Sequence, residues 1–498
     1  MPVEALTLNG RAHRARRACQ FCQRRKLKCT KDSPECSACK HYRQLCIYNN
    51  NAQNAVKQHE TPDSSQTHSR TLPQQYPNDR RAIANRFLDQ DLYRLTRSGL
   101  PPSSGSSVNL VCQAPVEGGR TALQETATRY FQIVHPWLPI ISKQRVFYQL
   151  LNPLVSLRAD VGFLCLCMKL CARAPEGENP WTSDYYAARQ SFADLHAAGV
   201  LSFETLQGSI LLAVYELGHA MYPAAHISIG ACLSYALALD IDRPDLNNSN
   251  SGSQTWAESE EQRRTWWAIF VLERVAAIGN PTRTMLVPEP EIFARIPCLE
   301  SEWEQKECKS ASATLASPPE SHGRYASVVQ ASYLLNRVFQ HVSDKSAPFD
   351  IQQEGLTQLD RTLHALITYS ESNTGTTYSI ICYQNAISFC GLMILYSPYL
   401  SSEDATVRQN AWASSDNAAQ VALKVAHQYN EGTITDFTYG GIPPFMLPWM
   451  YLAGAHFIRR GDFTSLSIIE AALRSLSDDW KSAGMFESSC YVKILDGV

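Results

Sequence analysis

The segment from Cys19 to Cys46 reads CQFCQRRKLKCTKDSPECSACKHYRQLC and holds six of the 16 cysteines in this chain of 498 residues. These cysteines form two copies of Cys-x2-Cys-x6-Cys, joined by six residues. A structural zinc ion takes four tetrahedral ligands and thiolates suit it, so six thiolates hold two ions when two sulfurs are shared. By the symmetry of the repeat, the shared sulfurs should be those of Cys19 and Cys36. We expect each Cys-x2-Cys to clamp one turn at the start of a short helix. The predicted zinc ligands are Cys19, Cys22, Cys29, Cys36, Cys39 and Cys46.

The cysteine array has two alternative explanations, a disulfide knot or a single zinc ion with two thiols unused. The N-terminal stretch MPVEALTLNGRAHRARR has no apolar run after its basic residues, so we expect neither a secretory signal nor an oxidising compartment. The regular doubled spacing disfavours the single ion. His41 has no counterpart in the other half of the array, so we expect it to be a surface residue rather than a ligand.

Basic residues gather around the first half of the array. A lysine or arginine at a helix end in the major groove can donate to guanine O6 and N7, while phosphate contacts supply affinity. The N-terminal arm fits two roles, phosphate contact and nuclear import. The predicted DNA-binding residues are Arg24, Arg25, Lys26 and Lys28 in the array, and Arg14, Arg16 and Arg17 in the arm.

Charge is distributed unevenly along the chain. The first 50 residues contain 11 Lys and Arg against 3 Asp and Glu, a net charge of +8, whereas the remaining 448 residues contain 34 against 44, a net charge of -10. The basic N-terminal segment indicates a module that binds a polyanion. The acidic remainder of the chain indicates a part with a different function.

Composition divides the chain into three parts: a zinc cluster domain at 11–50, a flexible linker at 51–120 and an all-helical domain at 121–498. Residues 49 to 81 contain only three large apolar side chains and cannot build a core, while Ile83 to Leu95 could form one short helix. The fold class is therefore mainly α. Beyond the helix that ends near His135, helical periodicity predicts segments at 203–221, 225–240, 258–278, 326–342, 351–371, 379–396, 405–429 and 464–483.

Two further stretches, 379–397 and 437–458, are uncharged enough to be tested as membrane spans. Polar residues lie inside the first and prolines break the second, so we expect buried helices of a non-membrane domain. In the segment 260–283, we expect Trp266, Trp267, Phe270 and Val271 to anchor a helix in the core. We expect Arg263, Arg264, Glu273 and Arg274 to form ion pairs near its ends. The acidic segment 300–304 suits a solvated loop, with an activation segment as the alternative.

The cysteine segment resembles the DNA-binding domain of the fungal binuclear zinc cluster transcription factors. It matches that family in its six cysteines, in the run from Arg25 to Cys29 and in Pro34. The resemblance implies that Lys26 contacts the bases of a CGG-like triplet. The body, from about Leu123 to beyond Pro297, is similar to the regulatory domain of the same family, in the segments YFQIVHPWLPII, IGAC and EEQRRTWWAIFVLERVAAIGNPTR.

These features predict a nuclear, sequence-specific transcription factor that binds double-stranded DNA, holds two structural zinc ions and regulates RNA polymerase II genes. The resemblance further implies control of a metabolic or secondary-metabolite gene cluster, a homodimer on paired sites, and contacts with the transcription machinery or co-regulators. Two alternatives remain open: a zinc module for protein contacts, and an enzyme with its active site in the body. The body contains no catalytic motif that we recognise, and His135, His219 and His226 suit core positions, so we predict no catalysis.

Overall fold

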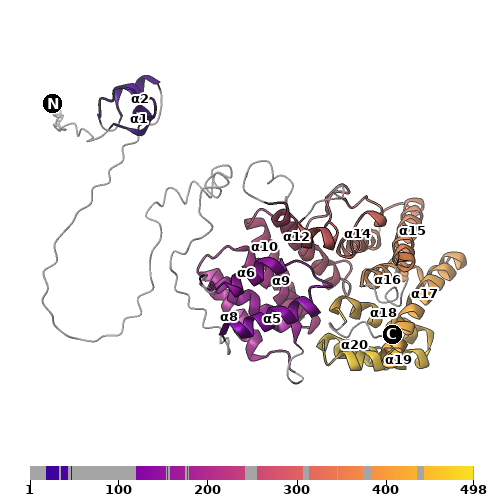
Figure 1. Cartoon of the computed structure of the whole chain (residues 1–498). Helices are drawn as coiled ribbons and strands as arrows, with labels where there is room; N and C mark the ends of the chain where they lie inside the picture. Colours follow the sequence, from indigo (N-terminus) through magenta and orange to yellow (C-terminus); the bar gives the residue numbers. More distant parts are fainter. Residues whose placement is uncertain are drawn as a thin grey trace, which may run out of the picture. The chain divides into compact units, whose positions relative to one another are not determined.

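The computed structural model describes residues 18–32, 35–42, 46, 119–152, 154, 157–173, 177, 179–241, 255–306, 313–344, 346–373, 383–433 and 442–496. The chain divides into two compact units, Met1–Leu88 and Asp89–Val498, which we describe separately (Figure 1). Most of the predicted linker at 51–120, including the helix expected at 83–95, lies outside the described residues. The described chain resumes at Gly119, where α5 begins.

The first unit contains two short helices, α1 (Gln20–Arg24) and α2 (Ser37–Tyr42). The helices of the first half of the second unit are α5 (Gly119–Ile133), α6 (Lys143–Leu151), α7 (Ala159–Ala172), α8 (Ser183–Ala197), α9 (Phe203–Gly218), α10 (Tyr222–Ala238) and α12 (Trp256–Ala276). Those of the second half are α13 (Glu300–Gln305), η1 (Pro319–Ser321), α14 (Arg324–Ser343), α15 (Phe349–Asn373), α16 (Tyr383–Tyr396), η3 (Ser397–Tyr399), α17 (Ala405–Asn430), η4 (Pro444–Met446), α18 (Leu447–Arg460), α19 (Phe463–Leu476) and α20 (Lys481–Asp496). Among the described residues, β structure is limited to isolated bridges such as that between Arg295 and Thr314.

Side chains cap many of these helices at their first turn, which explains where the helices begin. Thr255 forms a capping box with Glu258 at the start of α12, in which each residue satisfies a backbone N–H of the other. Ser, Thr and Asp side chains satisfy free N–H groups at other helix starts in the same way. These capping residues are Ser142 for α6, Thr182 for α8, Ser202 for α9, Asp404 for α17 and Asp462 for α19.

Two helices form the centre of the body. Helix α9 is buried from Glu204 to Gly218 and packs against α7, α8, α10 and α12. Helix α16 is buried from Gln384 to Tyr396 and packs against α14, α15, α17 and α18. Helix α12 packs against both α9 and α14 and so joins the two neighbourhoods (Figure 1). One continuous apolar core results, from Leu123 in α5 to Ala483 in α20.

The predicted helices agree with the structure except near the C-terminus. The segment 464–483 is not one helix, because α19 ends at Leu476 and α20 begins at Lys481. The intervening turn places the Trp480 indole in the core, where its Nε1 donates to the Ile442 carbonyl at 2.7 Å. In the segment 437–458, which prolines interrupt, Pro448 lies in the first turn of α18. A backbone N–H at this position has no helical partner, so proline is tolerated there. Within the described part of the chain, no helix has both the length and the apolar character that a membrane span needs.

The predicted residues of α12 form ion pairs, and these pairs are buried. The predicted anchors Trp267, Phe270 and Val271 are in the core, while Trp266 is only partly buried. The Arg264 Nε lies 2.9 Å from a Glu260 carboxylate oxygen, and both side chains are fully buried. The Arg274 guanidinium pairs with Glu273 at 2.5 Å and is also buried.

The segment 300–304 is not the solvated loop that we expected. It forms the short helix α13, and its Trp303 is buried. The Arg264 guanidinium carbon lies 4.5 Å from the centre of the Trp303 ring, and His135 stacks on the same residue at 6.0 Å. Trp303 is therefore held in the core by a cation–π contact and an aromatic contact, which the acidic character of the segment does not reveal.

Candidate metal centre and nucleic-acid interface

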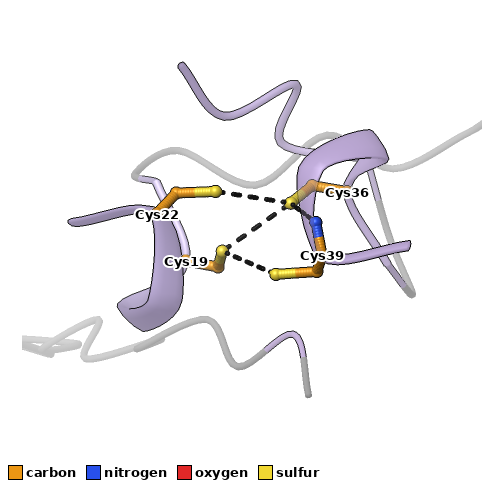
Figure 2. Close-up of side chains that lie close together, drawn as sticks. All are labelled: Cys19, Cys22, Cys36 and Cys39. Carbon is orange, nitrogen blue, oxygen red and sulfur yellow. Dashed lines mark hydrogen bonds between the residues drawn. The ribbon is translucent and has the colours of Figure 1, made fainter. Parts of the chain in front are cut away.

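The first unit brings four cysteine sulfurs together. Helices α1 and α2 each begin directly after the first cysteine of a half, Cys19 or Cys36. The Sγ atoms of Cys19, Cys22, Cys36 and Cys39 all lie within 4.8 Å of one another, and all four residues are buried (Figure 2). The prediction that each Cys-x2-Cys pair clamps a helix start is confirmed.

The sulfur contacts cross between the two halves. Cys19 Sγ lies 3.7 Å from Cys36 Sγ and 3.5 Å from Cys39 Sγ, and Cys22 Sγ lies 3.7 Å from Cys36 Sγ (Figure 2). Cys19 and Cys36 therefore each contact a cysteine of the opposite Cys-x2-Cys pair. Two sulfurs that ligate one tetrahedral zinc ion at 2.3 Å are separated by about 3.8 Å. The observed distances fit zinc coordination by sulfurs from both halves.

The remaining two cysteines of the array lie beside this group. The Cys29 Sγ is 3.9 Å from the Cys19 Sγ, and the Cys46 Sγ accepts a hydrogen bond from the Cys36 backbone N–H at 3.3 Å. Each half therefore places its third cysteine beside its own first cysteine. Burial raises the pKa of the Cys22 thiol to about 12, so a cation is needed to hold this sulfur as a thiolate at neutral pH.

A hydrogen bond that the cysteine spacing does not reveal also joins the halves. The Thr30 hydroxyl, one residue beyond Cys29, accepts from the Ser37 backbone N–H at 3.0 Å and lies 3.2 Å from the Ser37 hydroxyl. Ser37 is the first residue of α2. The contact therefore satisfies a free N–H at the start of the second helix with a side chain of the first half.

Lys26 follows α1 in a left-handed backbone conformation, with a φ of 53°. The Lys26 N–H donates to the Gln23 carbonyl at 3.3 Å, and the Leu27 N–H donates to the Cys22 carbonyl at 2.9 Å. These two bonds form a Schellman motif, the usual end of a helix at a glycine. The motif holds Lys26 at the C-terminal end of α1 with its side chain exposed.

The other predicted DNA-binding residues are only partly covered by the described chain. Arg25 and Lys28 are exposed on either side of Lys26, and Arg24 is the last residue of α1. The arm residues Arg14, Arg16 and Arg17 lie outside the described residues. His41 is exposed at the end of α2 and is not among the four clustered ligands, as expected.

Two families of protein domain match the chain. The fungal Zn(2)-Cys(6) binuclear cluster domain matches residues 17–55, and the fungal specific transcription factor domain matches residues 127–374. The chain is 34% identical over 179 residues to transcription factor BOA15 of Botryotinia fuckeliana, a match that covers 36% of this chain and 97% of that protein. The chain belongs to the fungal Zn(2)-Cys(6) transcription factors. A Zn(2)-Cys(6) domain binds two zinc ions, so the predicted family and metal are confirmed.

Other relatives of this Zn(2)-Cys(6) transcription factor are regulators of biosynthetic gene clusters. It is 24% identical over 303 residues to the azaphilone cluster-specific transcription factor azaR of Aspergillus niger, covering 58% of this chain and 62% of that protein. It is 25% identical over 188 residues to the ascochitine biosynthesis cluster transcriptional regulator of Didymella fabae, covering 36% of this chain and 32% of that protein. No solved structure matches the chain.

His135 and His219 of this transcription factor pack against core side chains, as predicted. Burial lowers the pKa of both His135 and His219 to about 3, so both rings are neutral at physiological pH. The His219 Nδ1 accepts from the Lys481 N–H at 3.2 Å, and the centre of its ring lies 5.2 Å from that of the Trp480 ring. His226 differs from the prediction, because it is only half-buried beside a small hollow that it shares with Arg283.

Proposed function

We propose that all six cysteines of the array are ligands, with Cys19 and Cys36 shared between two zinc ions. One ion would be held by Cys19, Cys22, Cys29 and Cys36, and the other by Cys19, Cys36, Cys39 and Cys46. The short sulfur distances across the halves support this arrangement, as do the positions of Cys29 and Cys46 beside Cys19 and Cys36. The metal supplies folding free energy, because a module of this size cannot bury a sufficient core.

The proposed ligand set predicts that the full chain binds two zinc ions and that chelation unfolds the cluster. Mass spectrometry of the full chain counts the zinc ions, and circular dichroism of residues 11–50 follows unfolding on chelation. Cys29→Ser should reduce the zinc count and destabilise the cluster, whereas Cys298→Ser in the body should leave the zinc count of the full chain unchanged. One ion per wild-type chain, or a fold that survives chelation, would contradict the shared-sulfur arrangement.

We propose that the C-terminal end of α1 recognises a CGG-like half-site in the major groove. The observation that carries this proposal is the Schellman motif, which fixes the exposed Lys26 at the helix end, where its ammonium can reach base edges. Arg24, Arg25 and Lys28 would add contacts beside it. Arg14, Arg16 and Arg17 of the arm would contact phosphates, a role that gives affinity without sequence preference.

We propose that the chain acts in the nucleus on RNA polymerase II genes, as a homodimer on paired half-sites. Because the chain beyond residue 50 has a net charge of -10, the body would regulate transcription through co-regulators rather than bind the duplex. The names of two relatives, which regulate azaphilone and ascochitine gene clusters, support a role in a secondary-metabolite gene cluster. Membership in a family of transcription factors supports the prediction that the chain catalyses no reaction.

The recognition proposal is tested by comparing Lys26→Ala with Arg14→Ala. Lys26→Ala should lose about 1 to 3 kcal/mol of preference for a CGG-like site over random DNA, because a base contact specifies sequence. Arg14→Ala should weaken binding to all DNA similarly and reduce its salt dependence. Fluorescence anisotropy with specific and random duplexes at several salt concentrations measures this. If Lys26→Ala weakens binding to both duplexes equally, then Lys26 is a phosphate contact. If the wild-type chain binds specific and random duplexes equally, the alternative of a zinc module for protein contacts is favoured.

A further inference from the structure

Helix α10 presents an uncharged face to solvent. None of its 17 residues is Asp, Glu, Lys or Arg. Ile227 is 66% exposed and Leu237 is 47% exposed, so a large apolar side chain lies open to solvent at each end of this face. The positions between and beside them carry small residues: Ser234 and Ala238 are exposed, and Gly230 and Ala231 are half-buried. In contrast, α15 exposes the charged residues Glu354, Arg361 and Glu371.

Gly230 is not required by packing among the described residues. A Cβ atom at Gly230 would contact only the Leu286 Cδ1, at an ordinary distance of 3.6 Å. In α9, by comparison, a Cβ atom at Gly208 would lie 2.5 Å from Phe163 Cε1. Core packing therefore requires a glycine at position 208. Because glycine destabilises a helix interior, Gly230 is better explained by the close approach of another chain.

The face of α10 is complementary to a copy of itself running in the opposite direction. Ile227 precedes Gly230 by three residues, and Leu237 follows Ser234 by three residues. Reversing the helix therefore pairs Ile227 with Leu237, and Gly230 with Ser234. A twofold interface requires this kind of self-complementary pattern. We propose that α10 is the surface through which the bodies of two chains form an antiparallel homodimer contact.

The size of this surface predicts a weak dimer in solution. A helix of this length spans about 25 Å, so one helix pair buries less than the roughly 800 Å² per partner of a standard interface. Leu286, which is 56% exposed and adjoins Gly230, enlarges the apolar area. Two chains bound to neighbouring half-sites would gain effective concentration and strengthen the contact. The inference rests on the proposed homodimer but not on DNA recognition. The homodimer and the role of α10 in it are therefore measured without DNA.

The first test measures the mass of the zinc-loaded full chain by analytical ultracentrifugation over a range of concentrations. Wild type should shift from monomer to dimer as its concentration rises. Ile227→Glu should raise the dimer dissociation constant at least about tenfold, because the contact would bury an unpaired carboxylate. The matched control is Ile351→Glu on α15, where the isoleucine is 59% exposed and the dissociation constant should not change. Circular dichroism confirms that both variants fold.

The second test determines the register with a short bis-maleimide cross-linker. Ala231 and its copy would be offset by about 3 Å along the helices, whereas Ala238 and its copy would be offset by about 18 Å. Ala231→Cys should therefore be captured as a dimer, while Ala238→Cys and wild type should not. Capture of both variants would mean a parallel contact and overturn the proposal.

Two further outcomes separate this inference from the homodimer on which it rests. The wild type could dimerise with rising concentration while Ala231→Cys is not cross-linked or Ile227→Glu does not change the dissociation constant. Either result would support the homodimer but show that α10 is not its interface. A wild type that stays monomeric at all concentrations would overturn both. If Ile227→Glu instead changes protease cleavage between residues 83 and 95 without changing mass, then a segment of the same chain covers α10, which also overturns the proposal.

Discussion

At the residue scale, Lys26 combines a proposed recognition role with an unfavourable backbone conformation. Its φ of 53° lies in the left-handed region, which costs a residue with a side chain about 1 to 2 kcal/mol. Glycine would occupy this position in the Schellman motif at lower free energy. Strained residues often mark functional positions, and the exposed ammonium supplies a reason for a lysine here.

We therefore predict opposite effects of Lys26→Gly on stability and recognition. The variant should raise the free energy of unfolding of the zinc-loaded cluster by about 1 kcal/mol, because the backbone strain is relieved. It should also lose preference for a CGG-like site as Lys26→Ala does. Chemical denaturation at a constant concentration of free zinc measures the free energy of unfolding. Fluorescence anisotropy titrations measure the preference for a CGG-like site. A Lys26→Gly cluster less stable than Lys26→Ala would show that the left-handed conformation carries no strain.

At the scale of elements, α12 joins the two halves of the core through buried charge. Arg264 pairs with Glu260 in the same helix, and its guanidinium donates to the Cys298 carbonyl at 2.7 Å. The Tyr325 hydroxyl, from α14, donates to the Arg264 carbonyl at 3.0 Å. The buried guanidinium charge is thus compensated by Glu260 and by the Cys298 carbonyl of a separate segment, as a buried ion requires, while Tyr325 ties α14 to the backbone of α12.

Removing the Arg264 side chain should strongly destabilise the body. Arg264→Ala leaves the buried Glu260 carboxylate with less compensating charge and opens space beside Trp303, so we expect a loss of about 3 to 5 kcal/mol. The control is Arg337→Ala, because Arg337 is half-exposed in its pair with Glu289 and such pairs contribute about 1 kcal/mol or less. Urea denaturation monitored by tryptophan fluorescence compares them. Equal effects would mean that Arg264 is not a core residue in solution.

At the scale of the whole molecule, the two compact units suggest a division of labour. The first is basic and holds the zinc cluster, while the acidic body forms its own continuous core. A negatively charged surface is repelled by DNA. The body is therefore expected to regulate rather than bind the duplex.

Separated fragments should each keep one function. A fragment ending near Asn50 should recognise a single half-site but lose control of transcription, and a fragment starting at Gly119 should bind no DNA. Affinity of the short fragment for paired half-sites should fall, because the body no longer supplies a dimer contact. Gel-shift and reporter assays test both fragments. Specific DNA binding by the body, or regulated transcription from the short fragment, would contradict the division.

The sequence by itself determined the features that depend on spacing within a few residues. The six cysteines predicted the metal, the family and the two helix starts, and apolar periodicity predicted most helices of the body. The tertiary structure alone decided which polar groups are buried, because their partners are distant in sequence. Tyr325 contacts a carbonyl 61 positions away, and Glu261 accepts from the Ser142 N–H across 119 positions. Burial of Trp303, the turn at Trp480 and the open face of α10 depend on such long-range packing, which local patterns do not encode.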